Sequence, residues 1–230
     1  MRIVNLSTAG AKQVIDFAAA HGIDYVEFDT GWYGKNEKDP KGGRVPIPGI
    51  NMSEVVEYAG RWSIGVILYV NWEPLKTQMD ALFPLYRDWG IKGVKFGFVD
   101  GSNQYGINFV HTSALKAAQY RLLVDIHDDY RPSGMTRTYP NLLTQEGVRG
   151  AEHRPNPEYN TIVPFARFLI GAADYTIPYF TVNPEEGIGT RAHHLALSVI
   201  YFSPIKFVFW NEYPSLYQGE PEIDFFGRVP

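Results

Sequence analysis

The sequence has no cysteine among its 230 residues. This absence excludes disulfide bonds, thiolate metal ligands and a cysteine nucleophile. A Ser–His–Asp site is weakly supported, because no serine lies in a G-x-S-x-G turn. A metal site and paired carboxylates remain to be compared.

Basic residues are also not in excess, since the net charge is −4 and the pI is near 5.9. A nucleic-acid partner would favour a basic stripe, so we expect none. No apolar run approaches the roughly 18 residues of a membrane span. The N-terminal stretch MRIVNLSTAG lacks the apolar segment of a signal peptide. Aromatic residues, in contrast, make up 15% of the chain, and aromatic faces suit both protein cores and the apolar faces of sugars.

Short apolar runs alternate with helix-length amphipathic stretches. The expected strands are 2–6, 23–29, 64–70, 93–99, 122–127, 141–146, 174–180 and 205–210. Several are almost continuously hydrophobic, as expected for a parallel sheet that is buried on both faces. The expected helices are 51–62, 79–90, 109–120, 160–173 and 189–202. Asn51 and Glu54 resemble a capping box at the start of the first, and Gly90 ends the second.

Eight strands with intervening helices predict an α/β fold, a (β/α)8 TIM-type barrel at the short end of its size range. An open doubly wound sheet is the alternative, although no glycine-rich phosphate loop follows the first strand. The barrel predicts that polar residues just past the strands meet at one rim. They include Asp29, Trp32, Glu73, Asp100, His127, Asp128, Glu146, Arg149, Glu152 and Glu212, and Lys95 lies within the fourth strand.

So many carboxylates at one rim repel one another unless a cation, a basic side chain or a raised pKa compensates. Zinc would favour histidine pairs, but His193 and His194 are adjacent and point in different directions on a helix. Paired carboxylates for glycoside cleavage fit best. A site rich in glutamate oxygens would suit Ca²⁺.

The segment HDDYRPSGMTRTYPNLLTQEGVRGAEH (127–153) resembles the catalytic segment of glycoside hydrolase family 97, which comprises α-glucosidases and α-galactosidases. YVEFDTGW (25–32), GVKFGFV (93–99) and NTIVPFARFLIGAADYT (160–176) support this resemblance. Complete members also carry an N-terminal β-sandwich and a small C-terminal β domain, and neither is evident in this sequence. The resemblance therefore implies a single catalytic barrel over residues 1–230. It also implies a periplasmic or extracellular location.

The resemblance also implies a mechanism. Retaining members carry an aspartate nucleophile in a Lys-x-Asp pattern, whereas this chain has Lys95, Phe96 and Gly97. Glycine is typical of the inverting α-glucosidases. Inverting members usually have glutamate where this chain has Asp128, a shortening by one methylene.

The roles that the resemblance implies concern an α-glucoside or oligosaccharide substrate. Glu152 is the general acid, and Glu73 and Asp128 are the general bases. Asp128, Glu146 and Glu152 hold Ca²⁺. The predicted substrate contacts are Lys95, His127, Asp29, Trp32 and Arg149. Two alternatives stay open: an α-galactosidase in which Asp100 acts as nucleophile, or a catalytically impaired barrel that binds sugar.

Overall fold

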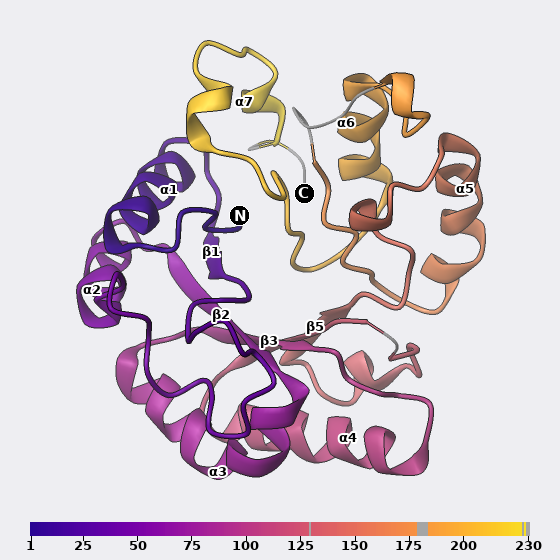
Figure 1. Cartoon of the computed structure of the whole chain (residues 1–230). Coiled ribbons are helices and arrows are strands. Elements are labelled where there is room, and N and C mark those ends of the chain that lie inside the picture. The colour runs from indigo at the N-terminus through magenta and orange to yellow at the C-terminus, as the bar shows by residue number, and fades with distance from the viewer. Residues whose placement is uncertain (129, 179–183, 227, 229–230) are drawn as a thin grey trace.

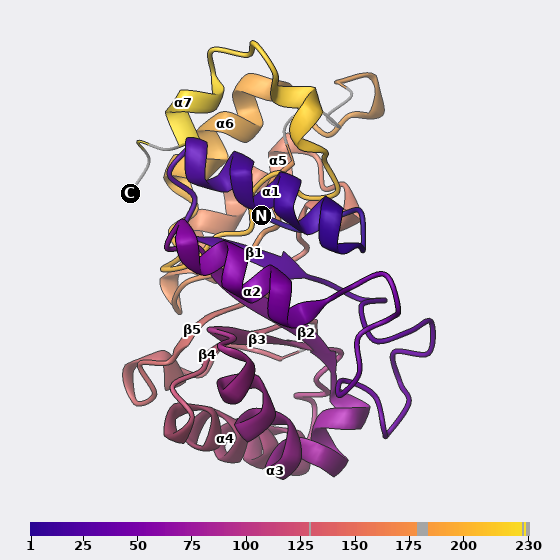
Figure 2. The same ribbon diagram turned by 90° about the vertical axis from the view of Figure 1, so that its left-hand side faces the viewer.

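The computed structural model describes residues 1–128, 130–178, 184–226 and 228. Five strands form one parallel sheet in the order β1-β2-β3-β4-β5. They are β1 (Tyr25–Phe28), β2 (Gly65–Asn71), β3 (Gly93–Gly97), β4 (Leu123–Ile126) and β5 (Leu142–Gln145). Figures 1 and 2 show the strands inside and the helices around them.

The helices that accompany the sheet are α1 (Thr8–Ala20), α2 (Met52–Arg61), α3 (Trp72–Trp89) and α4 (Gln104–Gln119). Their ends follow local signals in the sequence. Asn51 caps α2 by accepting a hydrogen bond from the Glu54 N–H, which confirms the predicted start of that helix. Gly90 ends α3 in the left-handed conformation that glycine adopts without steric cost. Helix α1, capped by Ser7, was not predicted.

The second half of the chain is less regular. It contains α5 (Pro157–Ile162), α6 (Arg191–Ile200) and α7 (Ile223–Phe226), together with short 3-10 turns. The expected helix 160–173 is wrong as one element, because α5 ends at Ile162 and gives way to two 3-10 turns, Val163–Phe165 and Arg167–Leu169. Pro164 cannot donate a backbone hydrogen bond, which weakens an α-helix at this point.

In the described part of the chain, three of the eight expected strands, 2–6, 174–180 and 205–210, are not regular strands, and residues 179 and 180 of the second lie outside the described residues. The segment at Arg2 pairs with Glu27 through one isolated parallel bridge, and Ile177 pairs with Val208 through another. A backbone hydrogen bond of 3.3 Å from Asp174 to Gln145 links the seventh segment to β5. The parallel α/β architecture is thus confirmed, whereas closure into a (β/α)8 barrel stays a prediction.

The two faces of the sheet differ in chemistry. One carries apolar side chains such as Val26, Leu68, Val94 and Val124, which belong to a large core shared with α1–α4. The other face carries buried polar and charged side chains: Glu27, Asp29, Tyr69, Asn71, Lys95, Asp125, His127, Thr144 and Glu146. Because side chains alternate along a strand, these residues share the face turned away from the helices.

Candidate active site

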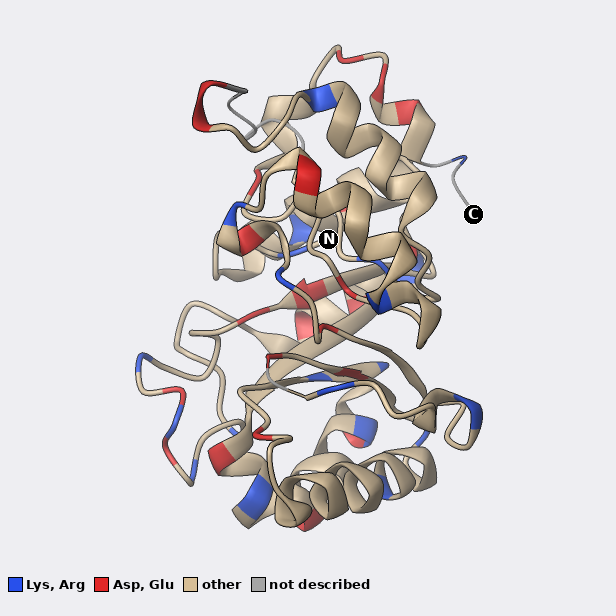
Figure 3. Ribbon diagram, turned by 90° about the vertical axis from the view of Figure 1, so that its right-hand side faces the viewer, with Lys and Arg blue, Asp and Glu red and all other residues tan. Residues whose placement is uncertain are grey.

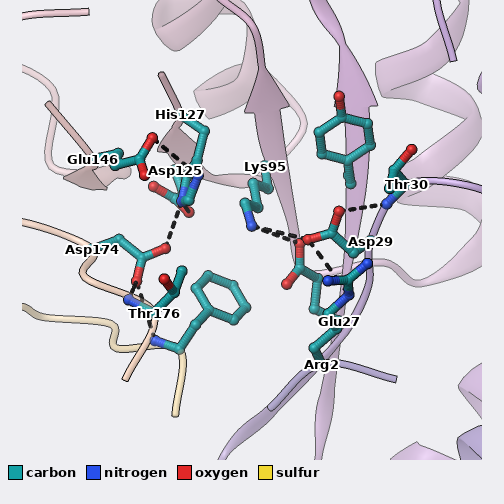
Figure 4. A network of polar contacts seen from close by, with 12 residues as sticks. Arg2, Glu27, Asp29, Thr30, Lys95, Asp125, His127, Glu146, Asp174 and Thr176 are labelled. Carbon is teal, nitrogen blue, oxygen red and sulfur yellow. Dashed lines mark hydrogen bonds and ion pairs between the residues drawn. The ribbon is translucent and has the colours of Figure 1, made fainter. Parts of the chain in front are cut away.

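A buried lysine lies on this polar face at the centre of the sheet. Lys95 Nζ is 3.0 Å from Asp29 Oδ2 and 3.5 Å from Glu27 Oε1, and Lys95 is only 2% exposed. The ammonium also lies 4.1 Å from the centre of the Trp210 ring, an attractive cation–π contact. Although burial disfavours the charged form, Asp29 and Glu27 raise the pKa of Lys95. Lys95 therefore remains a cation, and Figure 4 shows its side chain directed at Asp29 and Glu27.

The two carboxylates beside Lys95 behave differently. Burial works to raise the pKa of Asp29, but Lys95 and Arg2 outweigh it and hold that pKa at about 2. Burial raises the pKa of Glu27 to about 8, and Lys95 only partly opposes this. Asp29 is consequently the anion that pairs with Lys95, whereas Glu27 is mostly protonated at neutral pH.

His127 forms a second buried cationic centre, next to β4. Its Nε2 lies 2.6 Å from Asp174 Oδ2 and 3.3 Å from Asp125 Oδ2, and its Nδ1 lies 3.5 Å from Glu146 Oε2. Burial and Lys95 disfavour the imidazolium, but Asp125 and Asp174 raise the pKa of His127 well above its usual value. The ring is therefore held by the hydrogen bond between Nε2 and Asp174 and by the longer ion-pair contact between Nδ1 and Glu146.

Carboxylates gather beside this histidine. Ligand atoms of His127, Glu146 and Glu152 lie within 4.8 Å of one another, with His127 and Glu146 buried and Glu152 exposed. Burial raises the pKa of Glu146 to about 7, against the opposing effect of His127. The structure therefore brings together the two glutamates that flank the turn 147–151.

Asp128 lies at the same strand tips but faces another way. Its N–H donates to Glu146 Oε2 at 2.8 Å, while its own Oδ2 accepts a hydrogen bond of 2.6 Å from the Phe98 N–H at the end of β3. Its φ of 75° is a left-handed conformation that aspartate tolerates better than most residues. The Asp128 carboxylate is thus bonded to the tip of β3 and is not part of the Glu146–Glu152 group.

Gly97 leaves the end of β3 without a side chain. A Cβ atom at this position would overlap the phenol ring of Tyr69 from the neighbouring strand β2. Tyr69 is buried, and its hydroxyl lies 3.1 Å from Glu37 Oε2. The position therefore cannot accept a carboxylate unless the phenol moves.

The other predicted site residues, Trp32, Glu73 and Arg149, make contacts outside the clusters around Lys95 and His127. Trp32 is fully buried, and its indole N–H donates to the Tyr69 carbonyl at 2.7 Å. Its ring packs in the core against Tyr86 and Trp89 of α3, and a contact of Trp32 with substrate stays a prediction. Glu73 lies in the first turn of α3 and pairs with Lys76 at 2.8 Å. Arg149 is exposed, and its guanidinium donates to the His153 carbonyl at 3.3 Å.

Asp100 has a local role in the turn before α4. Its Oδ1 accepts a hydrogen bond of 2.9 Å from the Ser102 N–H, and its Oδ2 accepts one of 2.9 Å from Asn103 Nδ2. Hydrogen bonds from Ser102 lower the pKa of Asp100. This is the geometry of a turn-forming aspartate.

Sequence reasoning missed three buried acids: Glu27, Asp125 and Asp174. Glu27 and Asp125 lie inside the strands YVEF and LVDI. The available signal was a charge within an apolar run, which is uncommon without a partner. Figure 3 shows acidic positions on the strands as well as on the outer loops.

The site thus combines many carboxylate oxygens with two buried cations, Lys95 and His127. Comparison with known proteins shows the family to which the chain belongs. The model of Glycoside hydrolase 97 matches residues 3–148, more than half of the chain. The chain belongs to glycoside hydrolase family 97. The resemblance of residues 127–153 is thereby confirmed at the level of the family.

Curated relatives of this family extend well beyond the chain. A retaining alpha-galactosidase of Bacteroides thetaiotaomicron is 33% identical over 95% of this chain and 35% of its own length. A probable retaining alpha-galactosidase of Streptomyces bingchenggensis is 33% identical over 85% of this chain and 31% of its own. The chain thus spans about a third of the length of these relatives.

Solved structures agree in fold. A family 97 enzyme of Pseudoalteromonas sp. strain K8, solved with acarbose, has a TM-score of 0.86 and 25% identity, covering 97% of this chain and 40% of its own. A beta-arabinopyranosidase has a TM-score of 0.80 at 22% identity over 98% of this chain and 39% of its own, which shows a shared fold alone. None of the helices in the described part of the chain has both the length and the hydrophobicity to cross a bilayer.

Proposed function

We propose that residues 1–230 form the catalytic (β/α)8 barrel of a family 97 enzyme and hydrolyse α-glycosidic bonds at the carboxyl ends of the strands. Two sets of charged residues support this. Lys95 and Asp29 lie on the β1–β3 side, and His127, Glu146 and Glu152 lie on the β4–β5 side. Sugars offer hydroxyl groups all round the ring, and charged donors and acceptors bind them strongly.

Glu152 is the general acid in this proposal. It is exposed beside the buried Glu146, so a substrate can reach it. Asp128 is the general base, and it takes a proton from water as the water oxygen bonds to the anomeric carbon. The bond to the leaving oxygen breaks, and that oxygen takes the proton of Glu152. Glu73 is a weaker candidate for the base because its carboxylate pairs with Lys76.

We propose inversion of configuration, and the observation that carries it is the tip of β3. Retention requires a carboxylate nucleophile about 5–5.5 Å from the acid. Gly97 provides no carboxylate, and the Tyr69 ring covers the position. Asp128 instead reaches this tip through its hydrogen bond with the Phe98 N–H. This proposal departs from the two curated relatives, whose names describe them as retaining alpha-galactosidases.

Glu146 would hold Ca²⁺ through its carboxylate, and Glu152 would contribute only the carboxyl oxygen that does not carry the catalytic proton. The predicted third ligand, Asp128, would have to leave the Phe98 N–H to join them. Bound Ca²⁺ would offset the negative charge and orient the sugar. His127 already supplies one positive charge to Glu146 at 3.5 Å.

An α-glucoside is the proposed substrate. The family 97 enzyme of Pseudoalteromonas sp. strain K8, with a TM-score of 0.86, was solved with acarbose, which supports this choice. The alternative is an α-galactoside, favoured by the names of the two curated relatives. Asp100 is a poor nucleophile for that alternative, because hydrogen bonds from Ser102 and Asn103 occupy its carboxylate.

The test is proton NMR of the first sugar released from α-glucosyl and α-galactosyl substrates. We expect cleavage of the glucosyl substrate with the β-anomer appearing first. Initial release of the α-anomer would contradict inversion and the role of Asp128. Binding of sugar with no turnover would contradict hydrolysis and leave the impaired sugar-binding barrel as the better description.

A further inference from the structure

The two ring nitrogens of His127 have different surroundings. Nε2 lies 2.6 Å from the buried Asp174, whereas Nδ1 lies 3.5 Å from Glu146, in the group that also contains the exposed Glu152. Among the described residues, the only hydrogen bond of this ring is the one at Nε2. Nδ1 is therefore the nitrogen that faces the part of the site open to a substrate, and it has no hydrogen bond to lose when a sugar binds.

Asp174 is itself fixed through its other oxygen. Oδ1 accepts hydrogen bonds from the backbone N–H of Thr176 at 3.2 Å and from that of Phe207 at 3.5 Å. These two donors belong to the segments that meet in the bridge between Ile177 and Val208. One carboxylate oxygen thus bonds to the backbone and the other to His127, as Figure 4 shows. The carboxylate cannot turn without losing contacts on both sides.

The backbone beside Asp174 is strained. Thr176 is fully buried and has a φ of 56°, a left-handed conformation that is unusual for a β-branched residue. In this conformation its N–H donates to Asp174. Strained backbone is found most often where the surrounding structure serves a functional site. The placement of Asp174 therefore points to a role beyond stabilising the fold.

A second buried carboxylate near Nε2 offers an internal comparison. Asp125 Oδ2 lies 3.3 Å from the same nitrogen, and Asp125 is 3% exposed. Neither of its carboxylate oxygens has a hydrogen-bond partner among the described residues. Hydrogen bonds depend on angle, whereas the attraction between charges depends on distance alone. Asp125 can therefore attract the ring, but only Asp174 sets its orientation.

We propose that Asp174 is a positioning residue, whose hydrogen bond to Nε2 turns Nδ1 of His127 toward the substrate to donate to a hydroxyl of the sugar that is cleaved. The role of the sugar as substrate rests on the proposed function. A donor that is fixed before binding loses little entropy when the sugar arrives. A displacement of about 1 Å at such a contact can cost about 100-fold in rate.

A double-mutant cycle tests this role with a nitrophenyl α-glucoside, or with the α-galactoside if the protein cleaves that instead. We expect Asp174→Asn to lower kcat/KM about 100-fold. The amide oxygen is needed by the two backbone N–H groups, so the amide NH₂ group would face Nε2, which then cannot donate. In a His127→Gln background the same substitution should change kcat/KM by less than about twofold, because its partner is already absent. Equal losses in both backgrounds would overturn the proposal.

Two further substitutions serve as comparisons. Asp125→Asn removes the other carboxylate near Nε2 and should lower kcat/KM much less than Asp174→Asn does. Asp224→Asn removes an exposed carboxylate that lies 3.9 Å from His21 and should leave the rate unchanged. If Asp125→Asn caused as large a loss as Asp174→Asn, charge alone would account for the effect and the positioning role would be wrong.

NMR of the ¹⁵N-labelled unmodified protein provides a measurement that does not depend on the folding of Asp174→Asn. With His127→Gln used for assignment, maltotriose or raffinose should shift the signal of His127 Nδ1 and leave that of Nε2 in place. A shift at Nε2 alone, or at neither nitrogen, would overturn the proposal. A shift at Nδ1 without cleavage of either sugar would contradict the proposed hydrolysis and support the positioning role. An active enzyme with an additive cycle would have the opposite meaning.

Discussion

Lys95 and His127 are both buried cations held between carboxylates, yet the two sides of the site hold them in different ways. Lys95 projects from β3, and its partners Asp29 and Glu27 come from β1 or directly follow it. His127 follows β4, and its nearest partner, Asp174, lies in a segment that donates a backbone hydrogen bond of 3.3 Å to Gln145 of β5. One cation is therefore positioned by a regular sheet and the other by irregular chain.

This difference suggests that the Lys95 side mainly stabilises the fold and the His127 side mainly serves catalysis. The Lys95 side belongs to the large core that includes α1–α4, whereas the segments around Asp174 pack on a small core of Val163, Tyr175, Ile177, Leu197 and Tyr201. Segments with few buried apolar contacts open more readily than a regular sheet. We expect changes on the Lys95 side to affect folding most and changes on the His127 side to affect catalysis most.

The largest expected effect is that of Glu152→Gln on catalysis. Loss of the proton donor should slow hydrolysis of an α-glucoside with a poor leaving group by about 10²–10⁴-fold. The melting temperature of the Ca²⁺-free protein should hardly change because Glu152 is exposed. Steady-state kinetics measure the hydrolysis rate, and thermal unfolding measures the melting temperature. Glu158→Gln, an exposed glutamate on α5, is the control, and full activity of Glu152→Gln would end its assignment as acid.

Lys95→Met should give the largest loss of stability. Removing one partner of a buried ion pair typically costs about 3–5 kcal/mol, because Asp29 would keep a buried charge. Denaturant unfolding followed by tryptophan fluorescence measures this change. Lys92→Met, at an exposed position just before β3, should change the unfolding free energy by less than about 0.5 kcal/mol. Equal effects of the two substitutions would refute the contrast between the two sides.

Glu27 should make the protein less stable as the pH rises. Its folded pKa of about 8 lies above its ordinary value of 4.5, so its contribution to stability is complete below about pH 4.5 and is lost as the pH rises toward 8. The loss approaches about 1.4 kcal/mol per pH unit between these limits. Unfolding free energies at several pH values should fall more steeply for the unmodified protein than for Glu27→Gln.

Two neighbours modify this profile in known directions. Glu146, with a folded pKa of about 7, adds a decline that Glu27→Gln retains. Asp29, with a pKa lowered to about 2, acts in the opposite sense, because its contribution is present above about pH 4 and is lost as the pH falls toward 2. Parallel profiles of Glu27→Gln and the unmodified protein between pH 5 and 8 would contradict the buried, protonated state of Glu27.

The smallest expected effect comes from removal of Ca²⁺. A ligand at 100 times its dissociation constant stabilises the folded state by about 2.7 kcal/mol. A chelator should therefore lower the melting temperature of a Ca²⁺-loaded sample, and added Ca²⁺ should restore it. Glu146→Gln should abolish this response, whereas the exposed-site control Glu158→Gln should keep it. No response to the chelator in the unmodified protein would argue against the proposed ion site.

The order of elements could be predicted from the sequence because its signals are local. Asn51 and Gly90 mark helix ends through their own backbone and side-chain preferences. Apolar runs located β1–β5, whereas the segments at Arg2, Ile177 and Val208 form only isolated bridges. Their pairing depends on neighbours that are distant in the sequence, so a prediction from local propensity assigned longer strands there than the structure has.

The sequence by itself determined the family, the alternation of strands and helices and the set of acidic residues near strand ends. Only the tertiary structure decided which of these residues meet. It placed Trp32 in the core, bonded Asp128 to Phe98 and brought Asp174 against His127 across 47 positions. The physical reason is that charge pairing and burial act through space, whereas periodicity and capping act along the chain.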